Sequence, residues 1–172
     1  IKKILEDLQL EDVPAVNTPA TECLGKDPLG EPCQCAWNYA TMIGKLQCVY
    51  RHTRPEIGFA LSQASRFTFC PKRSHELAVI RIGQYLKGTA DKGMILQPIN
   101  LTEFKIDAYV DADFLGIYGK ESREDADNVR SRGGHIILVN GCPIVWQSKL
   151  IDGICMSTMM AEYYALSIAC NA

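Results

Sequence analysis

The sequence predicts an α+β protein in which a small helical module precedes three antiparallel strands and one helix. Between residues 36 and 92, apolar residues recur at spacings of three and four, which is the period of one helix face. After Gly93 the pattern changes to the alternation of half-buried strands. The pair Asn140-Gly141 is typical of a type I′ turn between two antiparallel strands.

The chain divides into three parts on these patterns. Residues 1–35 are expected to form an irregular connector, because Pro and Gly interrupt them repeatedly. Residues 36–92 are expected to form three short helices, with Pro55 in the first turn of the second, Ser74 as the cap of the third and Gly88 at its end. Residues 93–172 hold the strands and the last helix.

The third part predicts strands at residues 104–112, 135–139 and 143–147, separated by a long polar loop at 117–132 and by the Asn-Gly turn. In the first strand, we expect Ile106, Ala108 and Val110 to face the core. Ser157 or Thr158 is predicted to cap a helix that runs to the end of the chain. Its expected apolar stripe consists of Met159, Met160, Tyr163, Leu166 and Cys170.

Composition excludes a disordered chain and a membrane span. Apolar residues make up 47% of the 172 residues, and no apolar run approaches the roughly 18 residues that a span requires. The start, with Glu6 and Asp7, lacks the apolar stretch of a signal peptide, so an intracellular protein without a membrane partner is expected.

The net charge of −2 conceals an uneven distribution. Residues 1–44 carry three basic and seven acidic side chains, residues 45–92 nine and three, and residues 93–172 six and ten. A cationic middle between acidic flanks suggests a polyanionic partner, although a solvated helical surface has the same composition.

The eight cysteines do not predict a zinc site. Only Cys33 and Cys35 are close in sequence, and no Cys-x-x-Cys pair or neighbouring Cys/His pair completes a ligand set. We expect reduced thiols, several of them buried.

Two carboxylates are placed where a hard cation could bind. Asp111 lies inside an apolar strand, and Glu162 lies early on the last helix. A strand carboxylate facing one on a packed helix suits Mg²⁺, but both residues could equally be ordinary surface carboxylates. Asp113 could assist with the metal or end the strand in an Asx turn.

Residues 38–92 resemble the end of the reverse transcriptase region of Ty1/copia-type retrotransposon polyproteins, and the remainder resembles the ribonuclease H domain that follows it. The first resemblance rests on blocks that include Thr53-Arg54-Pro55-Glu56-Ile57-Gly58-Phe59-Ala60 and Arg81-Ile82-Gly83-Gln84-Tyr85-Leu86-Lys87-Gly88-Thr89. The second rests on Tyr109-Val110-Asp111-Ala112-Asp113, Ile144-Val145-Trp146-Gln147-Ser148-Lys149 and Ala161-Glu162-Tyr163-Tyr164-Ala165-Leu166.

The resemblance implies a thumb- or connection-like helical segment and the first half of a ribonuclease H-like fold. It implies that Asp111 and Glu162 are metal-binding catalytic residues, with Mg²⁺ or Mn²⁺ as the cofactor. It also implies an RNA–DNA hybrid and the remainder of the polyprotein as partners. The basic side chains expected to contact phosphates are Arg66, Lys72, Arg73, Arg81 and Lys87.

Two departures limit what the resemblance implies. The Tyr-x-Asp-Asp turn of the polymerase site has no match, so DNA synthesis is not expected. The strand that supplies a third metal-binding Asp in the family would follow Ala172, so we expect weak hydrolysis or none from this chain alone. A non-catalytic module that binds the nucleic-acid backbone and a decayed transposon remnant remain alternatives.

Overall fold

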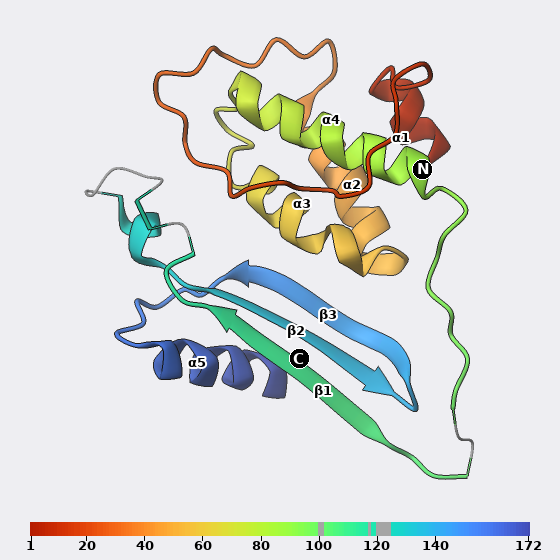
Figure 1. The fold of residues 1–172 in the computed structure, drawn as a ribbon, viewed down its shortest axis with the longest axis vertical. Helices are drawn as coiled ribbons and strands as arrows, with labels where there is room; N and C mark the ends of the chain where they lie inside the picture. The colour runs from red at the N-terminus through yellow and green to blue at the C-terminus, as the bar shows by residue number, and fades with distance from the viewer. Residues whose placement is uncertain (100–101, 117, 120–124) are drawn as a thin grey trace. The chain divides into compact units, whose positions relative to one another are not determined.

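The computed structural model describes residues 1–99, 102–116, 118–119 and 125–172. The chain forms two compact units, Ile1–Gly93 and Met94–Ala172. The first is helical and the second is a three-stranded antiparallel sheet with one helix, so the predicted α+β class is confirmed (Figure 1). Within the described residues, no helix combines the length and the apolar character needed to cross a membrane.

The first unit contains α1 (Lys2–Asp7), α2 (Tyr39–His52), η1 (Pro55–Ile57), α3 (Gly58–Ser65) and α4 (Arg73–Gly88). Helix α3 packs against both α2 and α4, and α1 packs against α2 and α4 (Figure 1). The predicted apolar stripes form the core, in which Leu46, Ile57, Ala64, Ile82 and Leu86 are fully buried.

The helix starts follow local hydrogen bonding. Asn38 caps α2, because its side chain accepts the N–H of Thr41 at 2.8 Å. The prediction that Ser74 caps the third helix is wrong: α4 begins at Arg73, and the Lys72 N–H donates to Nδ1 of the buried His75 at 3.0 Å. Ser74 lies in the first turn and donates to Asp27 instead.

The N-terminal segment is part of this unit's core. Residues 1–35 were expected to be irregular, but they begin with α1, and Ile4, Leu8 and Leu10 are buried. Only Ile4 lies within α1; the side chains of Leu8 and Leu10 pack closely against Gly83 of α4, which explains their burial.

Arg54, which precedes η1, links this part of the chain to Thr89 at the C-terminal end of α4. Its side chain is 2% exposed; Nη1 donates to the Thr89 carbonyl at 2.9 Å, Nη2 to the Thr89 hydroxyl and Nε to Glu56 at 2.6 Å. The guanidinium also lies 5.6 Å from the centre of the Tyr85 ring. Arg54 is therefore a structural residue of this fold.

The second unit is built on the sheet order β1–β2–β3, with β1 at Ile106–Asp113, β2 at Arg132–Val139 and β3 at Cys142–Leu150. Asn140 and Gly141 have φ values of 49° and 81°, as the predicted type I′ turn requires. The register of β2 with β3 shifts between Ile137 and Leu138, where Leu138 pairs with Pro143. Part of the polar loop expected at 117–132, namely residues 117 and 120–124, lies outside the described residues, and Ala126–Val129 forms η2.

Helix α5 (Thr158–Cys170) lies against the sheet through small residues (Figure 1). Ala161, Ala165 and Ala169 are its buried residues, whereas Met159 and Tyr163 are each 65% exposed, so the predicted apolar stripe is wrong. The reason is steric: a Cβ added at Gly133 of β2 would lie 3.3 Å from the Cβ of Ala165, so only small side chains permit this close approach.

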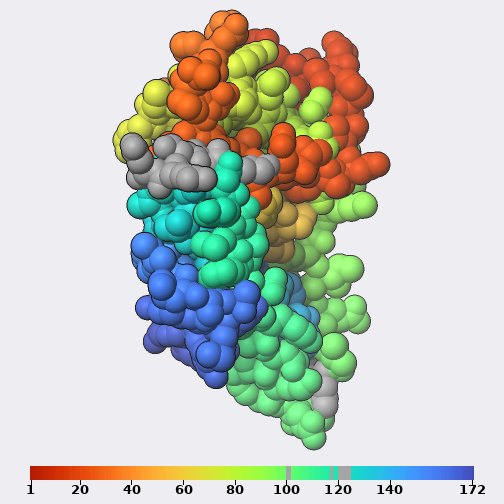
Figure 2. Space-filling view, turned by 60° about the vertical axis from the view of Figure 1, so that its left-hand side comes forward, coloured from red at the N-terminus to blue at the C-terminus, as the bar shows by residue number. Residues whose placement is uncertain are grey.

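The predicted inward face of β1 is also only partly correct. Val110 and Ala112 are half-buried, and Ala112 packs against the cluster beneath α5, but Ala108 is exposed and Ile106 is 57% exposed. Contacts with α5 therefore partly bury Val110 and Ala112, and the exposed α5 surface is visible in blue in Figure 2.

Candidate functional site

Asp111 is an exposed residue near the C-terminal end of β1, where it pairs with Gly134 of β2. Side chains alternate between the two faces of a strand. Because Val110 and Ala112 contact the α5 side, Asp111 and Asp113 project from the opposite face. The structure thus places Asp111 on an accessible surface beside the edge of the sheet.

Glu162 lies in the second turn of α5 and is exposed. The helix start is fixed by Ser157, whose hydroxyl accepts the Met160 N–H at 3.2 Å, as predicted. Glu162 lines a shallow hollow together with Val110 of β1, Met159, Tyr163 and Leu166. Glu162 therefore lies beside Val110, which precedes Asp111, on the α5 side of β1.

Both predicted carboxylates lie beside β1, but not on the same face: Glu162 of α5 lies on the α5 side of this strand, whereas Asp111 projects from the opposite side. Among the described residues, Asp111, Asp113 and Glu162 do not form a group of three ligand atoms within 4.8 Å of one another. Strand β1 is the edge strand of the described sheet, so the backbone beside Val110 and Asp111 has one side without a paired strand.

Asp113 favours the turn interpretation over the metal interpretation. An added Cβ at Gly116 would lie 1.8 Å from Oδ2 of Asp113, which means that this carboxylate folds over the Gly116 backbone. Leu115 between them has a positive φ of 55°. The Asp113 side chain thus occupies the turn that ends β1.

Strand β2 carries a buried histidine, His135, that was not predicted as a site residue from the sequence. His135 of β2 is 8% exposed and borders a hollow with Trp146, Lys149 and Asn171. Burial, and then the positive charge of Lys149, lower the pKa of His135. The neutral imidazole is therefore the favoured form in the fold.

The two predicted phosphate-binding lysines contact the N-terminal segment. Lys87 Nζ donates to the carbonyls of Leu10 and Val13, each at 3.0 Å, and to that of Glu11. Lys72 Nζ donates to the Gly30 carbonyl at 3.2 Å. Both ammonium groups therefore bind backbone oxygens of residues 1–35 in this structure.

The three predicted arginines are similarly engaged. Arg81 Nη2 donates to the Thr18 hydroxyl at 2.9 Å, and Arg66 Nη1 lies 3.4 Å from the Leu24 carbonyl. Arg73 pairs with Glu76, which raises the pKa of the Arg73 guanidinium. Phosphate contacts by these five residues stay a prediction, and most of them would require a side chain to leave a partner within the chain.

The structure contains a cluster of potential metal ligands that was not predicted from the sequence. Cys33, Cys35 and Glu76 bring three potential ligand atoms within 4.8 Å of one another. The expectation of no zinc rested on sequence spacing, and Glu76 lies on α4, far along the chain from the cysteines. The Cys-x-Cys spacing, which places two thiols on one side of an extended segment, was the available signal.

The sequence of the chain is similar to those of known polyproteins. The chain is 34% identical over 129 residues to the retrovirus-related Pol polyprotein from transposon RE1 of Arabidopsis thaliana, and 35% identical over 130 residues to that from transposon TNT 1-94 of Nicotiana tabacum. These matches cover 75% and 74% of this chain. The chain is therefore related to copia-type retrotransposon polyproteins over this matched region.

The matched region is a small part of those relatives, at 8% of the RE1 polyprotein and 9% of the TNT 1-94 polyprotein. A shorter relative is the secreted RxLR effector protein 161 of Plasmopara viticola, which is 30% identical over 131 residues, or 76% of this chain and 85% of the effector. No family model matches the chain, and no solved structure matches it.

Proposed function

We propose that this chain serves, as a segment of a copia-type polyprotein, in hydrolysis of the RNA strand of RNA–DNA hybrids. The observation that carries the proposal is the placement of Asp111 and Glu162, on β1 and α5, in a chain related to these polyproteins. Both carboxylates are exposed, and β1, which carries Asp111, has one edge without a paired strand in the described part of the sheet.

The donor chemistry fits a hard divalent ion. Asp111 and Glu162 each supply carboxylate oxygens, which Mg²⁺ and Mn²⁺ prefer. When bound, such an ion would lower the pKa of a water molecule for attack on the scissile phosphate. Asp111 of β1 and Glu162 of α5 would hold the ion. Because their side chains lie on different faces of β1, both would have to reach one ion around the unpaired edge of this strand.

The proposal includes a dependence on a third ligand. No third acidic or histidine side chain among the described residues joins Asp111 and Glu162 within 4.8 Å. A strand that pairs with the free edge of β1 would carry its side chains beside both carboxylates. We therefore expect the 172 residues alone to hydrolyse hybrids weakly or not at all.

The test compares this chain with an extended protein, in which the chain continues into the segment that follows the matched region in the RE1 polyprotein. Each is incubated with a labelled RNA–DNA hybrid and Mg²⁺. The extended protein should cleave the RNA strand, and Asp111→Asn or Glu162→Gln should reduce the rate by roughly 100-fold or more, since even outer-shell metal partners cost about 10–100-fold.

Asp107→Asn is the matched control. Asp107 lies on the same strand and face as Asp111 but is half-buried and pairs with Lys105 at 2.9 Å. This variant should cleave at the parental rate. A folded extended protein that binds the hybrid without cleaving it, or that cleaves equally well as Asp111→Asn, would contradict the proposed function.

A further inference from the structure

The cysteine-containing segment is held alongside the start of α4 by backbone hydrogen bonds. The Cys33 N–H donates to the Pro71 carbonyl at 3.1 Å, and the Arg73 N–H donates to the Glu31 carbonyl at 2.9 Å. These bonds flank an isolated antiparallel bridge between Pro32 and Lys72. The segment is therefore fixed in register with α4, so the positions of its thiols are determined by the fold.

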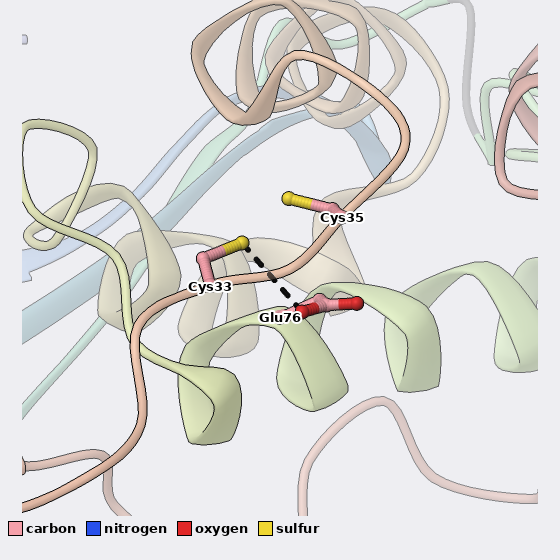
Figure 3. Close-up of side chains that lie close together, drawn as sticks. All are labelled: Cys33, Cys35 and Glu76. Carbon is pink, nitrogen blue, oxygen red and sulfur yellow. Dashed lines mark hydrogen bonds between the residues drawn. The ribbon is translucent and has the colours of Figure 1, made fainter.

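Both thiols are placed beside one buried carboxylate. Figure 3 shows Cys33 and Cys35 on the loop next to α4, with Glu76 on the helix below them. Cys33 Sγ lies 3.6 Å from Oε2 of Glu76, and the Gln34 N–H donates to the same oxygen at 3.1 Å. Glu76 is 4% exposed, although the two cysteines are half-buried and accessible to solvent.

The second carboxylate oxygen is held from outside the cluster. Arg73 donates to Oε1 of Glu76, so Oε2 is the oxygen that faces the thiols. The hydrogen bonds from Arg73 and from the Gln34 N–H therefore hold the Glu76 carboxyl in an orientation that directs Oε2 at the two sulfur atoms.

We propose that Cys33, Cys35 and Glu76 form a binding site for one thiophilic divalent ion of the Zn²⁺ class, with water in the fourth position. Zn²⁺ takes thiolate and carboxylate ligands at about 2.3 Å and about 2.0–2.2 Å, which places tetrahedral ligand atoms roughly 3.5–3.8 Å apart. The Cys33–Glu76 separation of 3.6 Å already has this value. The other pairs lie within 4.8 Å, so the sulfur atoms need to move by about 1 Å at most.

Metal binding at this site has two measurable consequences. A thiol that coordinates a divalent cation is deprotonated, so binding should release protons. Because the site belongs to the folded first unit, binding should also stabilise this unit.

His75 is excluded as the fourth ligand. Its Nδ1 accepts the Lys72 N–H, and its Nε2 lies 2.7 Å from the Gly25 carbonyl, to which it donates. Both ring nitrogens are thus engaged in holding the polypeptide. A three-ligand site with one open position follows, which is the ligand count of exchangeable rather than closed zinc sites.

The experiment uses the full 172-residue chain, reduced and stripped of metal, titrated with Zn²⁺ and with Co²⁺ as a spectroscopic probe. We expect one equivalent bound per chain, a sulfur-to-cobalt charge-transfer band and a higher unfolding temperature in Zn²⁺. The double change Cys33→Ser and Cys35→Ser should abolish all three effects. Arg73→Met, which leaves the ligands in place, should weaken binding by about 10–100-fold, as expected for an outer-shell partner.

The matched control replaces two exposed cysteines outside the cluster, Cys48→Ser and Cys70→Ser, and should bind like the parent. Equal binding by the parent and the Cys33/Cys35 double variant would overturn the proposal, as would loss of binding in the control. A parent Co²⁺ spectrum without a thiolate band would overturn it independently of whether any variant folds.

Discussion

Replacing Arg54 by methionine removes a buried guanidinium while keeping most of the volume of its stem. Two hydrogen bonds to Thr89 are lost, one to the carbonyl at 2.9 Å and one to the hydroxyl. Hydrogen bonds to charged groups contribute about 1.5–3 kcal/mol each. The ion pair with Glu56 adds little, because the Glu56 side chain is 40% exposed.

We therefore expect Arg54→Met to lower the free energy of unfolding of the helical unit by about 3 kcal/mol. For a unit of this size, that loss corresponds to a decrease in Tm of roughly 12–24 °C. The assay is urea and thermal unfolding followed by the helical circular dichroism signal. Arg54→Lys should recover only part of the loss, because a lysine lacks the fork that contacts Thr89 at two points.

Arg51→Met provides the control, since Arg51 is an exposed arginine on the neighbouring turn of α2. It should change stability by no more than about 0.5 kcal/mol. A loss below about 1 kcal/mol for Arg54→Met, or equal losses for the two variants, would refute the assignment of Arg54 as a buried structural tie.

Three further outcomes are expected for the sheet-containing unit, each measured as the urea midpoint of its unfolding. Gly133→Val should destabilise it by about 1–3 kcal/mol, because the Cβ of the new side chain would lie 3.3 Å from Ala165 of α5. Gly134→Ala should be tolerated, because the closest neighbour of its new Cβ is 3.6 Å away. Similar losses of stability in the two variants would contradict the close packing of α5 on Gly133. The fold holds the pKa of His135 below its unfolded value, so its contribution to stability is present above about pH 6.5 and is lost as pH falls through the lowered pKa. His135→Gln should flatten this dependence, Lys149→Met should reduce it, and an unchanged profile in both would contradict the assignment. Ser157→Ala should cost about 1 kcal/mol through loss of the α5 cap, and Ser157→Asp, which preserves the acceptor, should not.

The features that could be predicted from sequence are those set by local backbone chemistry. The Asn140-Gly141 turn requires two residues that tolerate positive φ, and the sequence supplies them. The Ser157 cap likewise depends on one hydroxyl before an apolar run. Periodicity similarly identified α2, α3 and α4 of the first unit, although not α1.

The features that could not be predicted depend on contacts between distant residues. Helix α5 is apolar on several sides, so its pattern does not reveal that alanines face the sheet; that choice is set by Gly133. The proposed metal ligands were missed because Glu76 joins Cys33 only through pairing of residues 31–33 with 71–73. Lys87 was interpreted as a phosphate ligand, but its nearest acceptors are carbonyls of the N-terminal segment.

The Asn140-Gly141 hairpin turn also affects the chemical stability of the chain. Asparagine followed by glycine is prone to deamidation, in which the Gly141 nitrogen attacks the Asn140 side-chain carbonyl, ammonia leaves, and hydrolysis of the resulting succinimide gives aspartate or isoaspartate. In the fold, Asn140 Oδ1 accepts the Lys105 N–H at 2.7 Å, while the Asn140 N–H donates to the Lys105 carbonyl at 2.8 Å. The first of these bonds restrains rotation of the Asn140 amide, which the attack by the Gly141 nitrogen requires. We therefore expect Asn140 to deamidate more slowly in the folded hairpin than in the unfolded chain.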